Sequence, residues 1–182
     1  MTINGQSVSN SESFAIRSII QSGITISPNS VSPVLKTPIT ISLESTFTHT
    51  LAKEDFSVNA THSSNSTIVK YLRVVSVDNA AKTLLCMFGG AESGAYEITI
   101  RHKVEGLVGS SVLALNVGST VTSVTPKIGS IYGGTVITIT GTNFGTEKTD
   151  NPVQISYNGG VGSTDCFVLT TSATQITCKV DD

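Results

Sequence analysis

The 182-residue chain has few charged residues, few aromatic residues and no tryptophan. Its formal net charge is −2, and it has no basic stripe of the kind that binds nucleic acid. No apolar run approaches the roughly 18 residues that a membrane-spanning helix requires. We therefore expect neither a nucleic-acid partner nor direct insertion into a membrane.

The sequence also lacks the clusters of side chains that catalysis and metal binding require. Its three histidines, His49, His62 and His102, are scattered and form no recognisable Ser/His/Asp arrangement. The acidic residues show no EF-hand spacing, and the glycine-rich stretch 158–162 has no following helix with which to cradle a phosphate. We expect no enzyme activity, no cofactor and no bound metal.

Serine, threonine, glycine and β-branched aliphatic residues dominate instead, and this composition favours strands and turns. Alternating or apolar runs predict strands at 39–43, 84–88, 96–100, 112–117, 136–140 and 153–157. No segment has a convincing helical period, and 44–55 is expected to form one helical turn at most. Short strands at this spacing are typical of a β-sandwich.

The chain contains an internal repeat. Residues 121–145 have a counterpart at 24–42, in which Pro28 corresponds to Pro126 and Ile39 to Ile137 (126 − 28 = 137 − 39 = 98). A fixed offset predicts two similar domains, which we place at 22–118 and 119–182. The second copy has no counterpart of the strands expected at 96–100 and 112–117.

Residues 1–21 resemble those two strands, and we interpret them as the tail of a repeat that is donated to a neighbour. Residues 1–3 resemble 98–100, and Phe14 precedes Pro28 by 14 residues, as Val112 precedes Pro126. Asn4-Gly5 is typical of a tight hairpin turn between the two strands. The residues expected to form the assembly strand are Ile3, Phe14, Ile16, Ile19 and Ile20.

Two of the three cysteines predict a disulfide. Cys166 and Cys178 lie 12 residues apart, and we favour a bond between them, which implies an oxidising compartment; free thiols are the alternative. Aligning Leu-Leu-Cys with Ile-Thr-Cys places Cys86 at the position of Cys178, and the same offset of 92 places Val74 at that of Cys166. We expect Cys86 to be a buried, unreactive side chain.

The segment 121–180 resembles the IPT/TIG family of immunoglobulin-like domains. The matching pattern is V-x-x-V-x-P-x-x-G-S-x-x-G-G-T-x-I-T-I-x-G-x-N-F-G, followed by Cys166 and by Ile-Thr-Cys at 176–178. The first copy is a weaker relative because it lacks the Gly-Gly-Thr and Asn-Phe-Gly elements. The resemblance implies an all-β fold of two tandem immunoglobulin-like sandwiches. The second would be incomplete within the chain and completed by a strand from a neighbouring copy.

Each residue of the motif has an expected structural role. Gly133-Gly134 would let the backbone turn sharply into the next strand. Gly141, Asn143 and Gly145 suit a turn with positive φ, and Phe144 would plug the end of the sandwich. Pro126 is expected to end the first strand at a sheet edge.

Two N-glycosylation sequons begin at Asn59 and Asn65. They lie in or just before the polar stretch 60–67, which we expect to be an exposed loop. Attached glycans at either site would require secretion.

Three functions remain open. The complementary ends favour a structural subunit or repeat of an extracellular filament, assembled head to tail from copies of this chain by β-strand addition. An excerpt from a covalent tandem array would have the same ends, as would a truncated fragment. The family resemblance also allows a fragment of a cell-surface receptor or adhesin that binds a protein or glycan, or an accessory module of a carbohydrate-active enzyme. The expected location is extracellular or at the cell surface.

Overall fold

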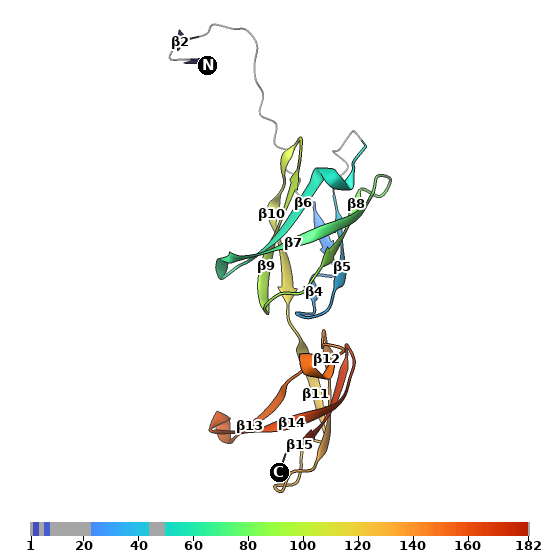
Figure 1. The fold of residues 1–182 in the computed structure, drawn as a ribbon, viewed down its shortest axis with the longest axis vertical. Coiled ribbons are helices and arrows are strands. Elements are labelled where there is room, and N and C mark those ends of the chain that lie inside the picture. Colours follow the sequence, from blue (N-terminus) through green and yellow to red (C-terminus); the bar gives the residue numbers. More distant parts are fainter. Residues whose placement is uncertain (1, 4–5, 8–22, 44–49, 182) are drawn as a thin grey trace.

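The structure is a computed structural model that describes residues 2–3, 6–7, 23–43 and 50–181. Its regular structure there is β-strand, apart from short 3-10 turns at Lys53–Asp55, Lys148–Asp150 and Asn158–Gly160. Two domains follow one another along the longest axis (Figure 1). We call residues 23–118 the first domain and residues 119–181 the second domain. In the described part of the chain, no helix is long and apolar enough to cross a membrane.

The first domain contains eight described strands. They hydrogen-bond in the order β3-β5-β8-β7-β6-β9-β10-β4, with β4 and β10 parallel at one end. The strands are β3 (Thr25–Ser27), β4 (Ser30–Val31), β5 (Thr37–Ser42), β6 (Phe56–His62), β7 (Asn65–Asp78), β8 (Thr83–Phe88), β9 (Gly94–His102) and β10 (Gly106–Val117).

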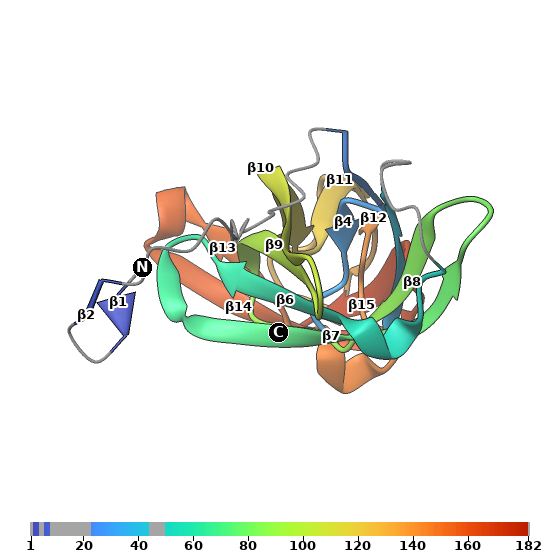
Figure 2. The same cartoon turned by 90° about the horizontal axis from the view of Figure 1, so that it is seen from above.

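The long strand β7 folds this sheet into a sandwich. Its first half pairs with β6, where Leu72 lies opposite Val58, and its second half pairs with β8, where Val74 lies opposite Cys86. Viewed along the long axis, β8 lies on one side and β9 and β10 on the other, and β7 runs along one edge of the view from the β6 side to β8 (Figure 2). Alternating side chains from both sides meet in a core that includes the fully buried Ile39 and Tyr96.

The second domain repeats five of those strands in the same order. They are β11 (Thr120–Thr125), β12 (Val136–Thr142), β13 (Val153–Tyr157), β14 (Gly162–Thr171) and β15 (Gln175–Val180). Their order, β11-β12-β15-β14-β13, matches β3-β5-β8-β7-β6. Strand β14 takes the place of β7, because its first half pairs with β13 and its second half with β15.

Strand pairing confirms the repeat and corrects one correspondence. Ile39 pairs with Cys86 as Ile137 pairs with Cys178, so these two cysteines are equivalent. Since Val168 pairs with Cys178 as Val74 pairs with Cys86, the counterpart of Cys166 lies two residues before Val74, at Leu72. The expected match of Val74 with Cys166 is wrong. The offset is 94 on β7 (166 − 72) but 92 on β8 (178 − 86), because the second domain connects these strands with two fewer residues.

The first strands of the two domains differ by a bulge. Ser27 pairs with Thr40, and Thr125 with the equivalent Thr138, and both precede a cis proline. Strand β11 then shifts register between Val121 and Ser123, whereas the pairing of β3 is regular. One extra residue therefore lies in β11, and the offset between the repeats falls from 98 to 97 on its N-terminal side.

The N-terminal segment contains β1 (Thr2–Ile3) and β2 (Gln6–Ser7), which pair antiparallel with Ile3 opposite Gln6. Positions 4 and 5, where the tight turn is predicted, separate the two strands. The other expected assembly residues, Phe14, Ile16, Ile19 and Ile20, lie outside the described residues.

Candidate assembly site in the second domain

An open apolar groove of about 810 Å³ lies in the second domain. Alternation along the strands directs aliphatic side chains into it, because residues two apart face the same side of a strand. Its walls include Val121 and Val124 from β11, Ile137 and Ile139 from β12, and Val153 and Ile155 from β13. This groove is the open half of a sandwich core.

In the first domain, strands cover the face that corresponds to the groove. Strand β9 pairs with β6 along the whole of Phe56–His62, and β10 pairs with β9. Their inward side chains, including Tyr96, Ile98, Leu113 and Leu115, are buried. The groove has the position that this pair of strands fills in the first domain.

Strand β13 presents an open edge beside the groove. Its counterpart β6 pairs on one edge with β7 and on the other with β9. Within the part of the chain that the structure describes, β13 pairs only with β14. Its second edge therefore offers backbone N–H and C=O groups to an additional strand.

The rim of the groove carries large exposed apolar side chains. Ile128 is 85% and Ile131 91% exposed, although both border the groove. In the first domain the equivalent stretch includes β4, which pairs with β10; the counterpart of Ile128 there is Ser30, a small polar residue that is also exposed. The second domain thus presents large apolar side chains where the first domain has a small polar one. Sequence reasoning did not identify the rim, although Ile128 and Ile131 flank the motif residue Ser130.

The motif residues have structural roles, with two corrections. Gly133 and Gly134 have φ of 70° and 73°, as expected for a sharp turn into β12. Asn143 has φ 62° and Phe144 is buried, also as expected. Gly141 and Gly145 do not have positive φ. A Cβ on Gly141 would collide with the Thr120 carbonyl and the Phe144 ring, and one on Gly145 with the Asp150 side chain, so both glycines permit close approach.

Asn143 also connects the two domains, a role that was not predicted. Its side-chain Nδ2 donates hydrogen bonds to Ser30 Oγ in the first domain and to the Gly118 carbonyl, both at 3.1 Å. The Ser119 hydroxyl in turn donates to the Asn143 carbonyl at 2.8 Å. These bonds fix the direction in which β11 leaves the first domain.

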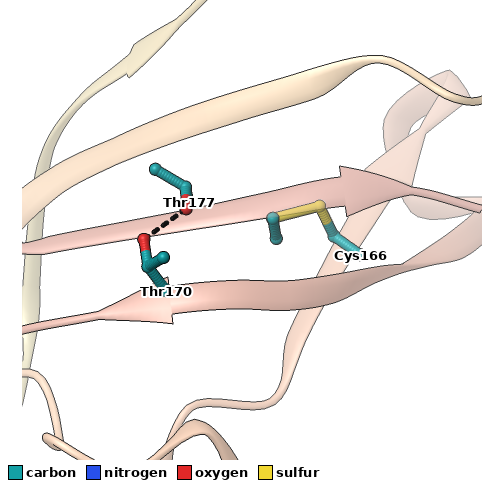
Figure 3. Close-up of a disulfide and its surroundings, with 4 residues drawn as sticks. Cys166, Thr170 and Thr177 are labelled. Carbon is teal, nitrogen blue, oxygen red and sulfur yellow. Dashed lines mark hydrogen bonds between the residues drawn. A yellow bond between two sulfur atoms is a disulfide. The ribbon is translucent and has the colours of Figure 1, made fainter.

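A disulfide joins Cys166 on β14 to Cys178 on β15, with the Cα atoms 5.4 Å apart (Figure 3). On the same two strands the Thr170 and Thr177 hydroxyl groups hydrogen-bond to one another. Both cysteines are buried in the small core beneath the groove. The covalent bond thus joins the two positions that Leu72 and Cys86 occupy in the core of the first domain.

Cys86 is buried, and burial raises the pKa of its thiol to about 11. The thiolate is the nucleophilic form of cysteine, so at neutral pH this side chain is an unreactive packing group.

The two sequons lie in different settings. Asn65 is the first residue of β7, directly after the tight connection at 63–64, and is exposed. Asn59 lies in the middle of β6 and is half-buried. The expected exposed loop over 60–67 is therefore wrong except at 63–64, because the stretch belongs to the end of β6 and the start of β7, although Asn65 is exposed as expected.

Comparison with known proteins gives one family match. Residues 119–182 match the family described as the IPT/TIG domain. No curated protein matches the chain in sequence.

Two solved structures are similar at low identity. One is the full extracellular region of plexin A4, with 13% identity, a TM-score of 0.34, and coverage of 93% of this chain and 24% of the plexin chain. The other is the Lin-41 filamin domain, with 12% identity, a TM-score of 0.38, and coverage of 56% of this chain and 97% of the filamin domain. The chain therefore spans about a quarter of the plexin extracellular region that it matches.

Proposed function

Because residues 119–182 form an IPT/TIG domain, we propose that this chain is a structural module of an extracellular filament. Each copy closes the second domain of its neighbour with strands from its own residues 1–21. The observation that supports this function is the shared strand order of the two domains. The second domain has an open groove on the face that β9 and β10 cover in the first.

The donated segment has the sequence pattern that the groove requires. With the offset of 97 that applies before the β11 bulge, Ile16 corresponds to Leu113 and Ile20 to Val117. Leu113 and Val117 are buried in the first domain. In an extended strand Phe14, Ile16 and Ile20 would share one face, as residues of a strand inserted into a core must. The same register turns Ile19 outward, because it corresponds to the exposed Asn116.

The same offset places the first donated strand against the open edge of β13. Ile3 corresponds to Ile100, which pairs with Val58 on β6. Val58 is equivalent to Val153, because Val58 pairs with Leu72 as Val153 pairs with Cys166. In this register Ile3 of one copy would lie opposite Val153 of the next, and its pairing with Gln6 in the single chain would be replaced, because its counterpart Ile100 pairs with Val108. Addition of a strand to an open edge supplies main-chain hydrogen bonds and pockets for alternate side chains.

The positions of the donated segment and the groove suit linear growth. The chain passes through β3 to Val31, which lies at the junction, where Gly118 N–H donates to the Val31 carbonyl at 3.0 Å. Strand β3 therefore begins at the end of the first domain that faces away from the second domain (Figure 1). A segment that enters there and binds the groove of another copy would extend a filament instead of closing a ring.

The buried disulfide supports a location outside the reducing cytosol, since such bonds persist in oxidising compartments. A second candidate function is a segment of a cell-surface receptor, which is favoured by the occurrence of IPT/TIG domains in extracellular receptors. In that case residues 1–21 would not bind the groove of another copy.

Two variants of the full chain separate these functions. Phe14→Asp with Ile16→Asp disables the donor and leaves the groove unchanged, whereas Ile128→Asp with Ile131→Asp disables the rim of the groove. Because Ile128 and Ile131 are exposed in the single chain, their substitution leaves its fold intact. Val161→Asp is a matched control, since Val161 is 88% exposed in the same domain and does not border the groove.

We expect the unaltered chain and the Val161→Asp control to form filaments visible by negative-stain microscopy, and each double variant to remain at 19.0 kDa by light scattering. A mixture of the two variants should form 1:1 dimers and nothing larger, because only one intact donor and one intact groove remain. The proposal fails if the mixture stays monomeric while the unaltered chain assembles, or if the unaltered chain remains monomeric. Native filaments that run as one very large polypeptide under denaturing conditions would show covalent continuity in place of donation.

A further inference from the structure

The hairpin between β6 and β7 presents one of the two sequons to solvent. His62 pairs with Asn65 across a connection of two residues, so Asn65 stands at the tip. The Thr67 backbone N–H and the Thr67 hydroxyl both donate hydrogen bonds to Asn65 Oδ1, at 3.1 and 2.7 Å. These two hydrogen bonds hold the Asn65 carboxamide through its oxygen, and its Nδ2 atom lies on the opposite side of the group. The third residue of the sequon thus orients the first.

The other sequon is enclosed by the sheet. Asn59 lies opposite Tyr71 on β7 and Thr99 on β9, so a neighbouring strand flanks it on each side. Its Oδ1 atom is buried and has no hydrogen-bond partner among the described residues. A sugar on this half-buried carboxamide would have to lie across the neighbouring strands.

We infer that Asn65 is an N-glycosylation site of this protein and that Asn59 is not used. The inference rests on the extracellular location in the proposed function. Transfer forms a bond between Asn65 Nδ2 and C1 of the first sugar of a lipid-diphosphate-linked oligosaccharide. The bond from C1 to the phosphate oxygen breaks, and the amide proton leaves with the lipid diphosphate.

A glycan on this hairpin is compatible with assembly. The hairpin, drawn in teal, projects sideways from the long axis of the molecule (Figure 1). It lies on the first domain, whereas the groove is bordered only by residues of the second domain. A bulky hydrophilic group at Asn65 would therefore cover the side of a filament and leave its joints accessible.

The test is secretion of the full chain from cells that perform N-glycosylation, followed by glycosidase treatment and peptide mass spectrometry. We expect one glycosylated site, with the mass shift abolished in Asn65→Gln and retained in Asn59→Gln. Thr67→Val and Thr61→Val remove each sequon while keeping its asparagine, and they should reproduce the two results if a glutamine substitution disturbs folding.

A glycopeptide containing Asn59, or an unmodified Asn65 in the secreted chain, would overturn the inference. Filament formation is measured on the same material. If the secreted chain forms filaments but carries no glycan, the glycosylation inference is wrong and the assembly proposal stands. If it is glycosylated at Asn65 but stays monomeric, the assembly proposal is wrong and the glycosylation inference stands.

Discussion

The two domains share five strands and differ in what covers them. In the first domain, β9 and β10 close the sandwich, and Ile39 on β5 is fully buried. In the second, the equivalent Ile137 borders an open groove, and Val121 on the neighbouring strand is 59% exposed. The comparison teaches that the same five-strand pattern can produce either a closed core or an open groove, depending on whether two further strands cover it.

The second domain has a smaller core than the first, and it contains a disulfide bond that the first lacks. The first domain packs Leu72 and Cys86 inside a large continuous cluster. At the equivalent positions the second has Cys166 bonded to Cys178. A cross-link stabilises by restricting the unfolded chain, so it does not require a closed core.

The largest difference is expected from matched core substitutions. Ile39→Ala should destabilise the first domain by ~4 kcal/mol, because truncation of a fully enclosed side chain leaves a cavity. Ile137→Ala should cost about half as much in the single chain, because Ile137, although only 7% exposed, borders an unfilled groove and already lacks packing partners on that side. Hydrogen exchange resolved by domain, during urea unfolding, measures both. Equal losses would mean that the second domain has a closed core, and assembly should increase the cost at Ile137.

The next effect concerns the disulfide. Cys166→Ser with Cys178→Ser should lower the stability of the second domain by ~3 kcal/mol, because the bond closes a short loop in the unfolded chain. The first domain should unfold at its original midpoint. Thermal unfolding with and without reductant measures this, and reductant should not change the double variant further. An unchanged midpoint for the second domain would contradict a stabilising bond.

The smallest effect concerns the joint between the domains. Asn143→Gly keeps the left-handed backbone conformation but removes the hydrogen bonds to Ser30 and Gly118, which should cost ~1 kcal/mol or less. The main result should be a broader distribution of distances between the two domains in small-angle X-ray scattering. Ser30→Ala removes only one of the two bonds and should have a weaker effect. An identical scattering profile would show that Asn143 does not hold the joint.

Much of this fold follows from local sequence. Alternation of apolar residues predicted the strands at 39–43, 84–88, 96–100, 112–117, 136–140 and 153–157, and the structure has a strand at each, although β10 begins six residues earlier than predicted, at Gly106. The long strands β7 and β14 were not predicted as single elements. Each changes partners halfway, so their buried positions do not follow one simple alternation.

The candidate assembly site shows more clearly which features the sequence alone could not predict. The repeat pattern indicated that the second copy lacks two strands, but the exposure of Ile128 and Ile131 at the rim was found only in the structure. The register proposed for residues 1–21 depends on the bulge in β11, which adds one residue without a sequence signal. Asn59 has the same sequon pattern as Asn65, and only strand pairing on both sides distinguishes them.

The sequence by itself determined the strand content, the repeat, the IPT/TIG resemblance and the turns at Gly133-Gly134 and Asn143, because these depend on the conformational preferences of neighbouring residues. Only the tertiary structure decided which strands pair, where the bulge shifts the register, which face of the second domain is uncovered and which asparagine is exposed. These features arise from contacts between residues far apart in the chain. A local sequence pattern does not show which distant residues come together.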